Sequence, residues 1–339
     1  MTFVVRPARR DDLDHLYEMA KLTGGGFTNL PADRGALATK LERSQAALDR
    51  SDDALDDDLF VLVLEEVATG EVRGTCQMFS QVGTRHPFYS YRLGTLTQFS
   101  QELNRTFRAE MLSLTTDLEG SSEVGGLFLH PGERAGGLGL LLARSRYLFI
   151  AAHRARFADH ILAELRGIID EAGGSPFWDG LAGRVFGMNF QDADRYNATN
   201  GHQFIADLFP RHPIYVAMLG ESARAAIGLP HPSGRAAMRM LENEGFAYEC
   251  YVDIFDGGPT MTARTDEVAS IGRATTDRIV ALDTRPDSYR ALAATGIRHD
   301  FRCTFARLAP AAEGVVIDPA AATALNVVAG DRISHVGRE

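Results

Sequence analysis

A glycine-rich turn in the middle of the chain has the residue types and spacing of an anion-binding site. Arg134-Ala135-Gly136-Gly137-Leu138-Gly139 follows the apolar segment Leu127-Phe128-Leu129 and precedes a long apolar stretch typical of a helix. The first N–H groups of a helix lack partners within it, and the helix dipole favours negative charge there. Glycines let a phosphate approach the backbone closely. The segment therefore predicts a phosphate site, and the alternative is a glycine-rich helix start without a ligand.

Two nucleotide-binding motifs are excluded by this spacing. A dinucleotide fingerprint needs G-x-G-x-x-G or a final Ala, but Gly137 and Gly139 are followed by Leu142. A Walker A loop needs Gly-Lys-Ser or Gly-Lys-Thr, which the segment lacks. The remaining pattern, R-x-x-G-x-G, resembles the CoA-binding turn of the GNAT acyltransferase superfamily. The resemblance implies a CoA-binding set of Leu127, Phe128, Leu129, Arg134, Gly137, Leu138 and Gly139.

The elements that must position this turn occur in the order typical of that superfamily. Apolar spacing predicts the elements from residue patterns alone. In chain order they are a strand at 3–5, helices at 11–22 and 33–48, a hairpin of 59–65 and 72–82, strands at 89–96 and 120–129, a helix at 137–156, a strand at 161–167, short helices at 177–186 and 192–196, a helix at 235–245 and a strand at 246–255. Gly125 and Gly126 lie inside the strand at 120–129, where glycine favours a bulge or a close backbone approach.

This order predicts an α+β fold. We expect a GNAT-like, mixed and mostly antiparallel sheet flanked by helices over residues 1–270. Residues 271–339 contain short apolar runs between turns and are expected to form a small β-rich C-terminal subdomain that resembles the end of a small β-barrel.

Bulk composition narrows the class of protein. The 339 residues carry a formal net charge of −10, which argues against a nucleic-acid surface. The three cysteines, Cys76, Cys250 and Cys303, are far apart and form no metal-binding pattern. The N-terminus has no export signature, and the longest apolar run is too short to span a membrane. We therefore expect a cytoplasmic protein without a membrane or nucleic-acid partner and without a bound metal.

Seven ordered blocks give a narrower resemblance. They are TGGG at 23–26, YRLGTL at 91–96, GSSE at 120–123, RGIIDE at 166–171, SPFW at 175–178, HPIY at 212–215 and YVDIFDGGPT at 251–260. Together they resemble the arginine N-succinyltransferase family over residues 6–260 and more thinly to the C-terminus. The resemblance implies succinyl transfer from succinyl-CoA to the α-amine of arginine, or of ornithine in some members, in arginine catabolism. It also implies succinyl-CoA as co-substrate, no permanently bound cofactor, and a homo- or hetero-oligomer.

Two residue roles follow from the resemblance. The family's proton donor is a His in a His-Pro step before the late helix, a place occupied here by His231-Pro232. The family's succinyl-CoA contact on the central strand falls on Leu127. The alternative for His231 is a histidine packed beside proline. One departure is the compact turn at residues 130–133, where the family often has a longer polar turn.

The chemistry requires further groups. An α-ammonium must lose a proton before it attacks the thioester, so a base or a water chain to one is needed. Glu123 is the second candidate base, and the alternative is a surface-edge carboxylate. Backbone N–H groups near Gly126 and Leu127 are expected to stabilise the oxyanion. No covalent intermediate is required, which fits the absence of a convincing Cys–His pair.

Substrate contacts are assigned by charge. A guanidinium pairs best with carboxylates, for which Asp253, Asp256 and Glu164 are candidates. The succinyl carboxylate requires a cation, for which Arg92 or Arg166 is a candidate. Gly25 and Gly26, in the run of three glycines, offer free backbone N–H groups to a ligand, whereas a plain helix end is the alternative. For each of these five charged residues, the alternative is an ordinary structural ion pair without a role in substrate binding.

Two other functions remain open from the sequence. One is a GNAT-fold acyltransferase with a different amine or acyl donor, and the other is a non-catalytic CoA-binding sensor, because a fold does not fix a function.

Overall fold

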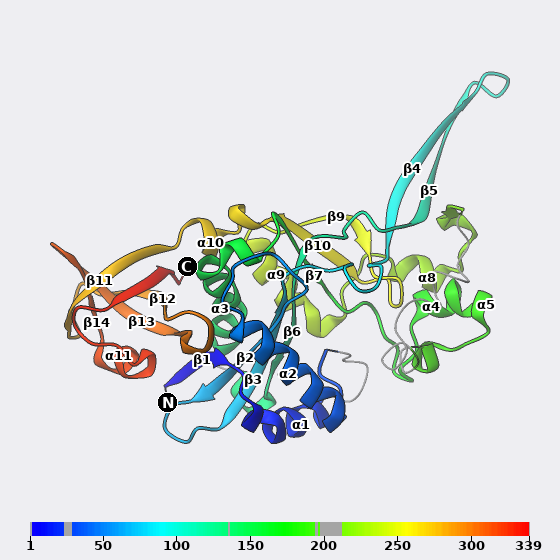
Figure 1. The fold of residues 1–339 in the computed structure, drawn as a ribbon. Coiled ribbons are helices and arrows are strands. Elements are labelled where there is room, and N and C mark those ends of the chain that lie inside the picture. The colour runs from blue at the N-terminus through cyan, green and yellow to red at the C-terminus, as the bar shows by residue number, and fades with distance from the viewer. Residues whose placement is uncertain (1, 24–28, 135, 194–195, 197–211, 339) are drawn as a thin grey trace. The chain divides into compact units, whose positions relative to one another are not determined.

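The computed structural model describes residues 2–23, 29–134, 136–193, 196 and 212–338. They form two compact units, each built from separate stretches of the chain (Figure 1). Unit 1 consists of Met1–Ser80, Ser122–Asp159 and Arg264–Glu339, and unit 2 of Gln81–Ser121 and His160–Ala263. The sequence-based boundary between residues 270 and 271 stays a prediction.

The sheet of unit 1 joins the N-terminal strand to strands from the end of the chain. β1 (Phe3–Pro7) pairs antiparallel with β2 (Leu59–Glu66) on one side and with β13 (Arg302–Ala311) on the other. β2 pairs with β3 (Val72–Phe79), which in turn pairs with β6 (Ser122–Leu129). All of β1 is buried, as expected for a strand with neighbours on both sides. The predicted hairpin and the mostly antiparallel sheet are confirmed.

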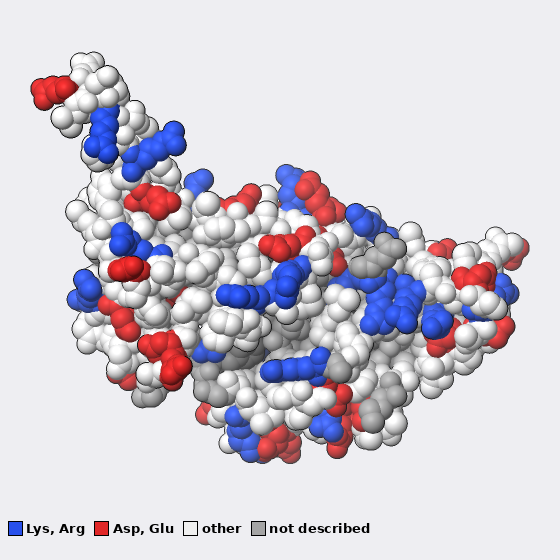
Figure 2. Space-filling view, turned by 180° about the vertical axis from the view of Figure 1, so that it is seen from behind, with Lys and Arg blue, Asp and Glu red and all other residues white. Residues whose placement is uncertain are grey.

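The C-terminal strands close into a ring. The strands are adjacent in the order β12 (Tyr289–Thr295), β15 (Arg332–Gly337), β11 (Thr275–Leu282), β14 (Gly314–Ile317) and β13. The ring closes because β12 pairs with both β15 and β13. Small apolar residues such as Ala291 and Ala293 fill its interior together with helix α11 (Pro319–Leu325). The expected β-rich C-terminal part is thus confirmed. On the face drawn in Figure 2, Lys and Arg side chains gather over the region where Figure 1 places β12, β13 and the C-terminal end.

Three helices complete the part of unit 1 that matters for function. α1 (Leu13–Lys21) and α2 (Arg34–Asp49) share an apolar core with β2 and β3. α2 begins at Asp33, whose Oδ1 accepts a hydrogen bond from Ala36 N at 2.7 Å. α3 (Leu138–Ala152) is apolar on nearly all sides and is buried from Leu141 to Ile150. All three helices were predicted from the sequence, the first of them from its apolar spacing.

Unit 2 has its own core and a run of adjacent strands. The strands of this unit are adjacent in the order β7 (His160–Glu164), β10 (Pro259–Arg264), β9 (Ala247–Val252), β4 (Ser90–Ser100), β5 (Arg105–Thr115) and β8 (Ile214–Tyr215). Trp178, in α4 (Pro176–Gly180), is fully buried and stacks between Phe186 and Phe255. The other helices include α5 (Ala182–Phe186), α8 (Glu221–Ala226) and α9 (Arg235–Asn243).

One expectation for unit 2 was incomplete. The sequence predicted a single strand at 89–96, but β4 runs on to Ser100 and pairs with β5 along its whole length. Figure 1 shows this pair as a long hairpin that extends away from α4, α5 and α8. Most of its side chains are exposed, including Phe99, Leu103 and Phe107. β5 therefore lacks the buried apolar face that marks a strand in sequence.

Within the described part of the chain, no helix has the length and apolar character needed to cross a membrane.

Candidate active site

The central strand β6 contains a bulge at its glycine pair. Gln77 of β3 pairs with Gly125, and Thr75 pairs with Phe128, so Gly126 and Leu127 together face the single residue Cys76. Gly126 has φ of 58°, a left-handed conformation that side chains rarely adopt. A bulge takes an extra residue out of the ladder and re-aims the backbone. The sequence prediction of an irregularity at Gly125-Gly126 is confirmed.

A polar network lies next to this bulge in unit 1. Glu123, on β6, is buried, and a Cβ built on Gly125 would come within 3.0 Å of its Oε1. Gln77 Nε2 donates to Asn29 Oδ1 at 2.6 Å. Lys40 of α2 donates from Nζ to the Asn29 backbone oxygen. These hydrogen bonds link β3 to helix α2 through the loop residue Asn29, and Glu123 interacts with the charge of Lys40.

The two charged members of the network perturb each other. Burial raises the pKa of Glu123 to about 7, and the charge of Lys40 opposes that rise. Burial lowers the pKa of Lys40 to about 8, whereas Glu123 acts to raise it. A carboxylate with a pKa near neutrality can take up and release protons under ordinary conditions, as a general base must.

Sequence reasoning missed Lys40, Asn29 and Gln77. A signal existed for Lys40, because it lies three residues after Leu37 and four before Ser44, both of which are fully buried on α2. Helical spacing therefore places it close to the buried face, where an unpaired lysine is rare. Asn29 and Gln77 carried no comparable signal.

The predicted phosphate turn has the expected backbone. Gly136 and Gly137 both have left-handed φ values, of 73° and 81°, and Gly137 precedes the first residue of α3. Leu140 N and Leu141 N donate to Gly137 O at 3.0 and 3.1 Å, which starts the helix. The N–H groups of Leu138 and Gly139 lie in the first turn, where a helix offers no acceptor. Arg134 is exposed beside them, and the start of α3 therefore presents donors and a cation to an anion.

The predicted contacts on the strand are half-buried. Leu127, Phe128 and Leu129 all have intermediate exposure, and Leu129 pairs with Gly74. A Cβ on Gly139 would lie 3.9 Å from the Leu129 side chain. The structure thus brings the end of β6 and the start of α3 together within unit 1.

In unit 2 the structure brings together His231 and Arg166. His231 N donates to Arg166 O at 2.7 Å. Burial, and after it the charge of Arg166, lowers the pKa of the His231 imidazole below its ordinary value. His231 Nδ1 lies 2.7 Å from Ser233 Oγ and accepts from Ser233 N at 3.3 Å. When Nδ1 accepts, the neutral ring carries its proton on Nε2, which can then act as a donor.

The acidic candidates of unit 2 are engaged with backbone. Asp256 is buried, and its oxygens accept from Gly167 N and Gly258 N, both at 2.8 Å. Burial and the nearby Asp253 raise the pKa of Asp256 well above its ordinary value. Asp253 Oδ1 accepts from Phe255 N and Asp256 N. Both carboxylates thus hold a turn, and their contact with substrate stays a prediction. Glu164, at the end of β7, is half-buried.

Arg92 belongs to an exposed cluster on β4 and β9. Its guanidinium lies 5.6 Å from the centre of the Tyr251 ring, and its Nη1 is 3.6 Å from Asp117 Oδ2. Tyr251 Oη donates to the same Asp117 carboxylate at 3.1 Å. The arginine side chain is 60% exposed, so it is open to a ligand carboxylate. Gly25 and Gly26, the remaining predicted contacts, lie outside the described residues.

Two of the three cysteines, Cys76 and Cys303, are buried, and Cys250 is exposed. Burial raises the pKa of the Cys76 thiol to about 12 and also raises that of Cys303, so neither forms a thiolate readily. Among the described residues, no group of three or more His, Cys, Asp and Glu side chains is arranged to hold a metal ion.

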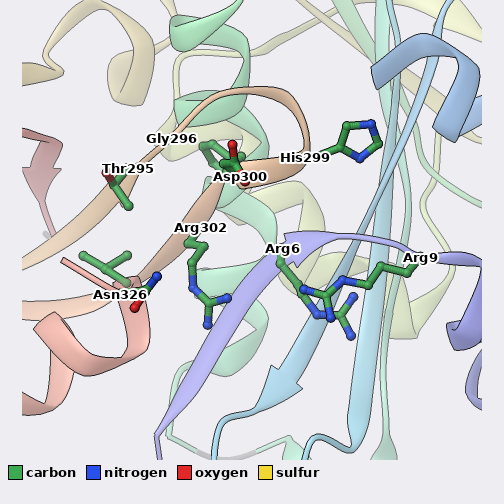
Figure 3. Close-up of a pocket in the computed structure, with 10 residues that line it drawn as sticks. Arg6, Arg9, Thr295, Gly296, His299, Asp300, Arg302 and Asn326 are labelled. Atoms are coloured by element: carbon green, nitrogen blue, oxygen red, sulfur yellow. The ribbon is translucent and has the colours of Figure 1, made fainter. Parts of the chain in front are cut away.

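A separate pocket of unit 1 is lined by none of the predicted site residues. It has a volume of about 290 Å³ and lies between the end of β1 and the turn before β13 (Figure 3). Its arginines include Arg6, which is already held by Asp12 at 2.8 and 2.9 Å. His299 in turn contacts Asp49 at 2.7 Å. Carboxylates thus contact two of the basic residues that line this pocket.

Comparisons with known proteins agree over the full length of the chain. A family model described as arginine N-succinyltransferase beta subunit matches residues 3–270, and one described as the C-terminal domain of that subunit matches residues 274–337. An arginine N-succinyltransferase from Citrobacter koseri is 42% identical over 338 residues, covering 98% of this chain and 97% of the relative. An Escherichia coli enzyme of the same name gives the same values.

A solved structure gives the same result for the fold. It is described as arginine/ornithine succinyltransferase subunit AI from Pseudomonas aeruginosa and superposes with a TM-score of 0.90 at 31% identity. The match covers 99% of this chain and 98% of that chain. The predicted GNAT-like α+β fold is confirmed by this match and by the strand order described above.

Proposed function

The chain belongs to the arginine N-succinyltransferase family, and we propose on this basis that it transfers the succinyl group of succinyl-CoA to the α-amine of L-arginine and releases CoA. The observation that carries the proposal is the β6 bulge followed, in the same unit, by the left-handed glycine pair at the start of α3. The bulge can hold a thioester carbonyl, and the glycine pair can hold a pyrophosphate. L-Ornithine is the second acceptor that we propose, at lower efficiency.

CoA binding is assigned to the end of β6 and the start of α3. The pyrophosphate takes hydrogen bonds from the first-turn N–H groups of Leu138 and Gly139, with Arg134 as the nearby cation. The pantetheine arm runs along Leu127, Phe128 and Leu129, which are half-buried residues at the end of an extended strand. Succinyl-CoA is a co-substrate in this scheme, and no permanently bound cofactor takes part.

The reaction proceeds by direct attack. The neutral amine nitrogen bonds to the thioester carbon, and the carbonyl oxygen becomes an oxyanion. Backbone N–H groups at Gly126 and Leu127, which the bulge removes from the β3 ladder, donate to that oxygen. The C–S bond then breaks, the amide is left on the acceptor, and the thiolate of CoA takes up a proton.

Glu123 is the proposed general base. It accepts the proton that the amine loses, directly or through a water molecule. Its burial beside the bulge and its pKa of about 7 support this role, because the group is ionised just above neutral pH and holds a proton just below it. Lys40 is the proposed positioning residue that keeps the carboxylate partly ionised.

His231 is the proposed donor to the leaving thiolate or the oxyanion. Its Nδ1 contacts with Ser233 direct the proton of the neutral ring to Nε2. Arg92 and Arg166 are the proposed partners of the succinyl carboxylate, because a guanidinium matches a carboxylate in geometry as well as charge. Asp253, Asp256 and the loop of Gly25 and Gly26 remain proposed contacts of the amino-acid substrate.

The cellular setting is also part of the proposal. We expect a cytoplasmic enzyme, as the sequence features predict, and a role in arginine catabolism, as the family resemblance implies. An oligomer is expected too, since the relatives named above are described as subunits.

The experiment that tests the proposal is a CoA-release assay with the purified protein. Succinyl-CoA and acetyl-CoA are each supplied with L-arginine, L-ornithine, L-lysine or no amine. Fast CoA release that requires both succinyl-CoA and L-arginine supports the proposal, and release that does not depend on an amine contradicts it.

A further inference from the structure

Three arginines stand in a row across neighbouring strands of the C-terminal ring. Arg290 of β12 is directly opposite Arg307 of β13. On the other side of β12, Ala291 is opposite Gly337, and Arg338 N donates to Arg290 O at 3.1 Å, so that Arg338 continues the row. Side chains at directly opposite positions point to the same face of a sheet. The row therefore lies on the outer face of the ring, since the neighbouring residues Ala291 and Leu308 fill its interior.

This arrangement is unfavourable without an anion. Like charges placed directly opposite each other on neighbouring strands repel. Asp318 accepts a hydrogen bond from the backbone N–H of Arg307 at 2.7 Å, but among the described residues no carboxylate forms an ion pair with the guanidinium of Arg290, Arg307 or Arg338. Burial and the charge of Arg290 both lower the pKa of Arg338. The basic side chains over this region in Figure 2 are consistent with such an unbalanced patch.

The row ends at the phosphate turn. Arg338 Nη2 donates to Gly136 O at 3.2 Å, and a Cβ on Gly137 would come within 2.5 Å of that same nitrogen. The guanidinium lies 3.8 Å from the centre of the Phe305 ring, which holds it in place over the turn. Arg338 is therefore fixed beside the glycine pair that opens α3, and within the described part of the chain its other N–H groups have no hydrogen-bond partner.

We propose that Arg338, with Arg290 and Arg307 next to it, binds the phosphate groups of CoA and that the C-terminal ring is thereby part of the CoA site. The proposal rests on the proposed function, because it assumes CoA at the start of α3. CoA carries a pyrophosphate and a further phosphate on its ribose, which is more negative charge than Arg134 and one helix start can balance. The row supplies three more cations from a part of the chain more than 150 residues away from the turn in sequence.

The test measures the dissociation constant of CoA by titration calorimetry with the full-length protein. Arg338→Ala should weaken CoA binding about 10-fold, which is typical of one charge-assisted hydrogen-bonded contact at a half-exposed site. Arg290→Ala combined with Arg307→Ala should weaken it by a similar factor. Arg285→Ala, which removes a charge from the loop between β11 and β12, is the matched control and should change the constant less than 2-fold.

Two further measurements separate binding from folding and from catalysis. Arg338→Lys keeps the charge but loses the planar group over Phe305, so it should recover part of the affinity. The KM for L-arginine should not change in any of these variants, and the melting temperature should not fall in the double variant, which removes like charges that repel. Unchanged CoA affinity in both Arg338→Ala and the double variant would overturn the inference while the proposed function stands. Failure of the wild-type protein to bind CoA at all would overturn both.

Discussion

Lys40 of α2 and Glu123 of β6 form a pair of opposite charge beside the bulge of the central strand. Burial raises the pKa of Glu123 to about 7 and lowers that of Lys40 to about 8, while each charge opposes the shift of the other. Around neutral pH both groups are therefore close to titration. The pair places a proton acceptor next to the backbone that is proposed to hold the thioester carbonyl.

The first prediction concerns Glu123. Because the base must be ionised, kcat/KM should rise with pH through about 7, the value to which burial raises the pKa of this carboxyl group. Glu123→Gln should abolish this rise of kcat/KM with pH and lower kcat by roughly 10²–10⁴-fold. Glu110→Gln, a change at an exposed carboxylate of β5, is the control. Near-normal turnover in Glu123→Gln would exclude the assignment.

The second prediction concerns Lys40. Its charge lowers the pKa of Glu123, so Lys40→Met should raise that pKa further and move the acid limb of the pH profile to higher pH. Activity should then fall most at and below pH 7. Lys40→Arg keeps the charge and should leave the limb close to its original position. A limb that stays in place or moves to lower pH in Lys40→Met would show that the two groups do not interact as described.

The third prediction concerns the bulge. Gly126 has φ of 58°, and a Cβ there would lie 2.8 Å from Gln77 Cγ and Cδ. Gly126→Ala should therefore displace the strand and lower kcat/KM for succinyl-CoA by roughly 10²-fold, as small misplacements of reacting groups do. Gly94→Ala is the control, because nothing lies within 4 Å of a Cβ at Gly94. Equal steady-state kinetics in the two variants would contradict a role for the bulge.

The fourth prediction concerns His231. If Nε2–H donates to the thiolate or the oxyanion, His231→Ala should lower kcat by roughly 10²–10⁴-fold with little change in KM. His231→Gln retains an N–H donor and should recover part of the rate. The idea fails if His231→Ala turns over at a near-normal rate, or if the Gln and Ala variants are equally slow.

The fifth prediction concerns the acyl group. Arg92→Ala should raise KM much more for succinyl-CoA than for acetyl-CoA, because only the succinyl group carries a carboxylate. Its present contacts with Asp117 and Tyr251 leave the side chain 60% exposed and able to turn toward a ligand. Equal losses with both donors would rule out Arg92 as the carboxylate partner and would favour Arg166.

Local patterns predicted the parts of the structure that depend on neighbouring residues. The glycine pair Gly125-Gly126 indicated the bulge, and the spacing from Arg134 to Gly139 indicated the left-handed turn before α3. Both features depend on the backbone conformation of a few consecutive residues. Glycine positions and helical spacing predict such local conformations directly. The apolar spacing of α1 predicted its buried face in the same way.

Features that depend on long-range pairing were not predictable. The arginine row requires Arg290, Arg307 and Arg338 to meet through the register of three strands, and a shift of one residue would turn these side chains to the other face. Lys40 interacts with Glu123 only because α2 packs on β2 and β3 joins β2 to β6. The strand β5 was missed for a different reason, since its side chains are mostly exposed and lack a buried face.

The most direct test of the proposed function is the amine dependence of CoA release from succinyl-CoA. The proposed function predicts that L-arginine gives the highest kcat/KM, that L-ornithine is slower, and that acetyl-CoA is a poor donor with either amine. The α-amide of succinate and arginine should accumulate in equal amount to the free CoA. CoA release that is as fast without any amine, or binding of CoA with no transfer to any amine tested, would contradict it.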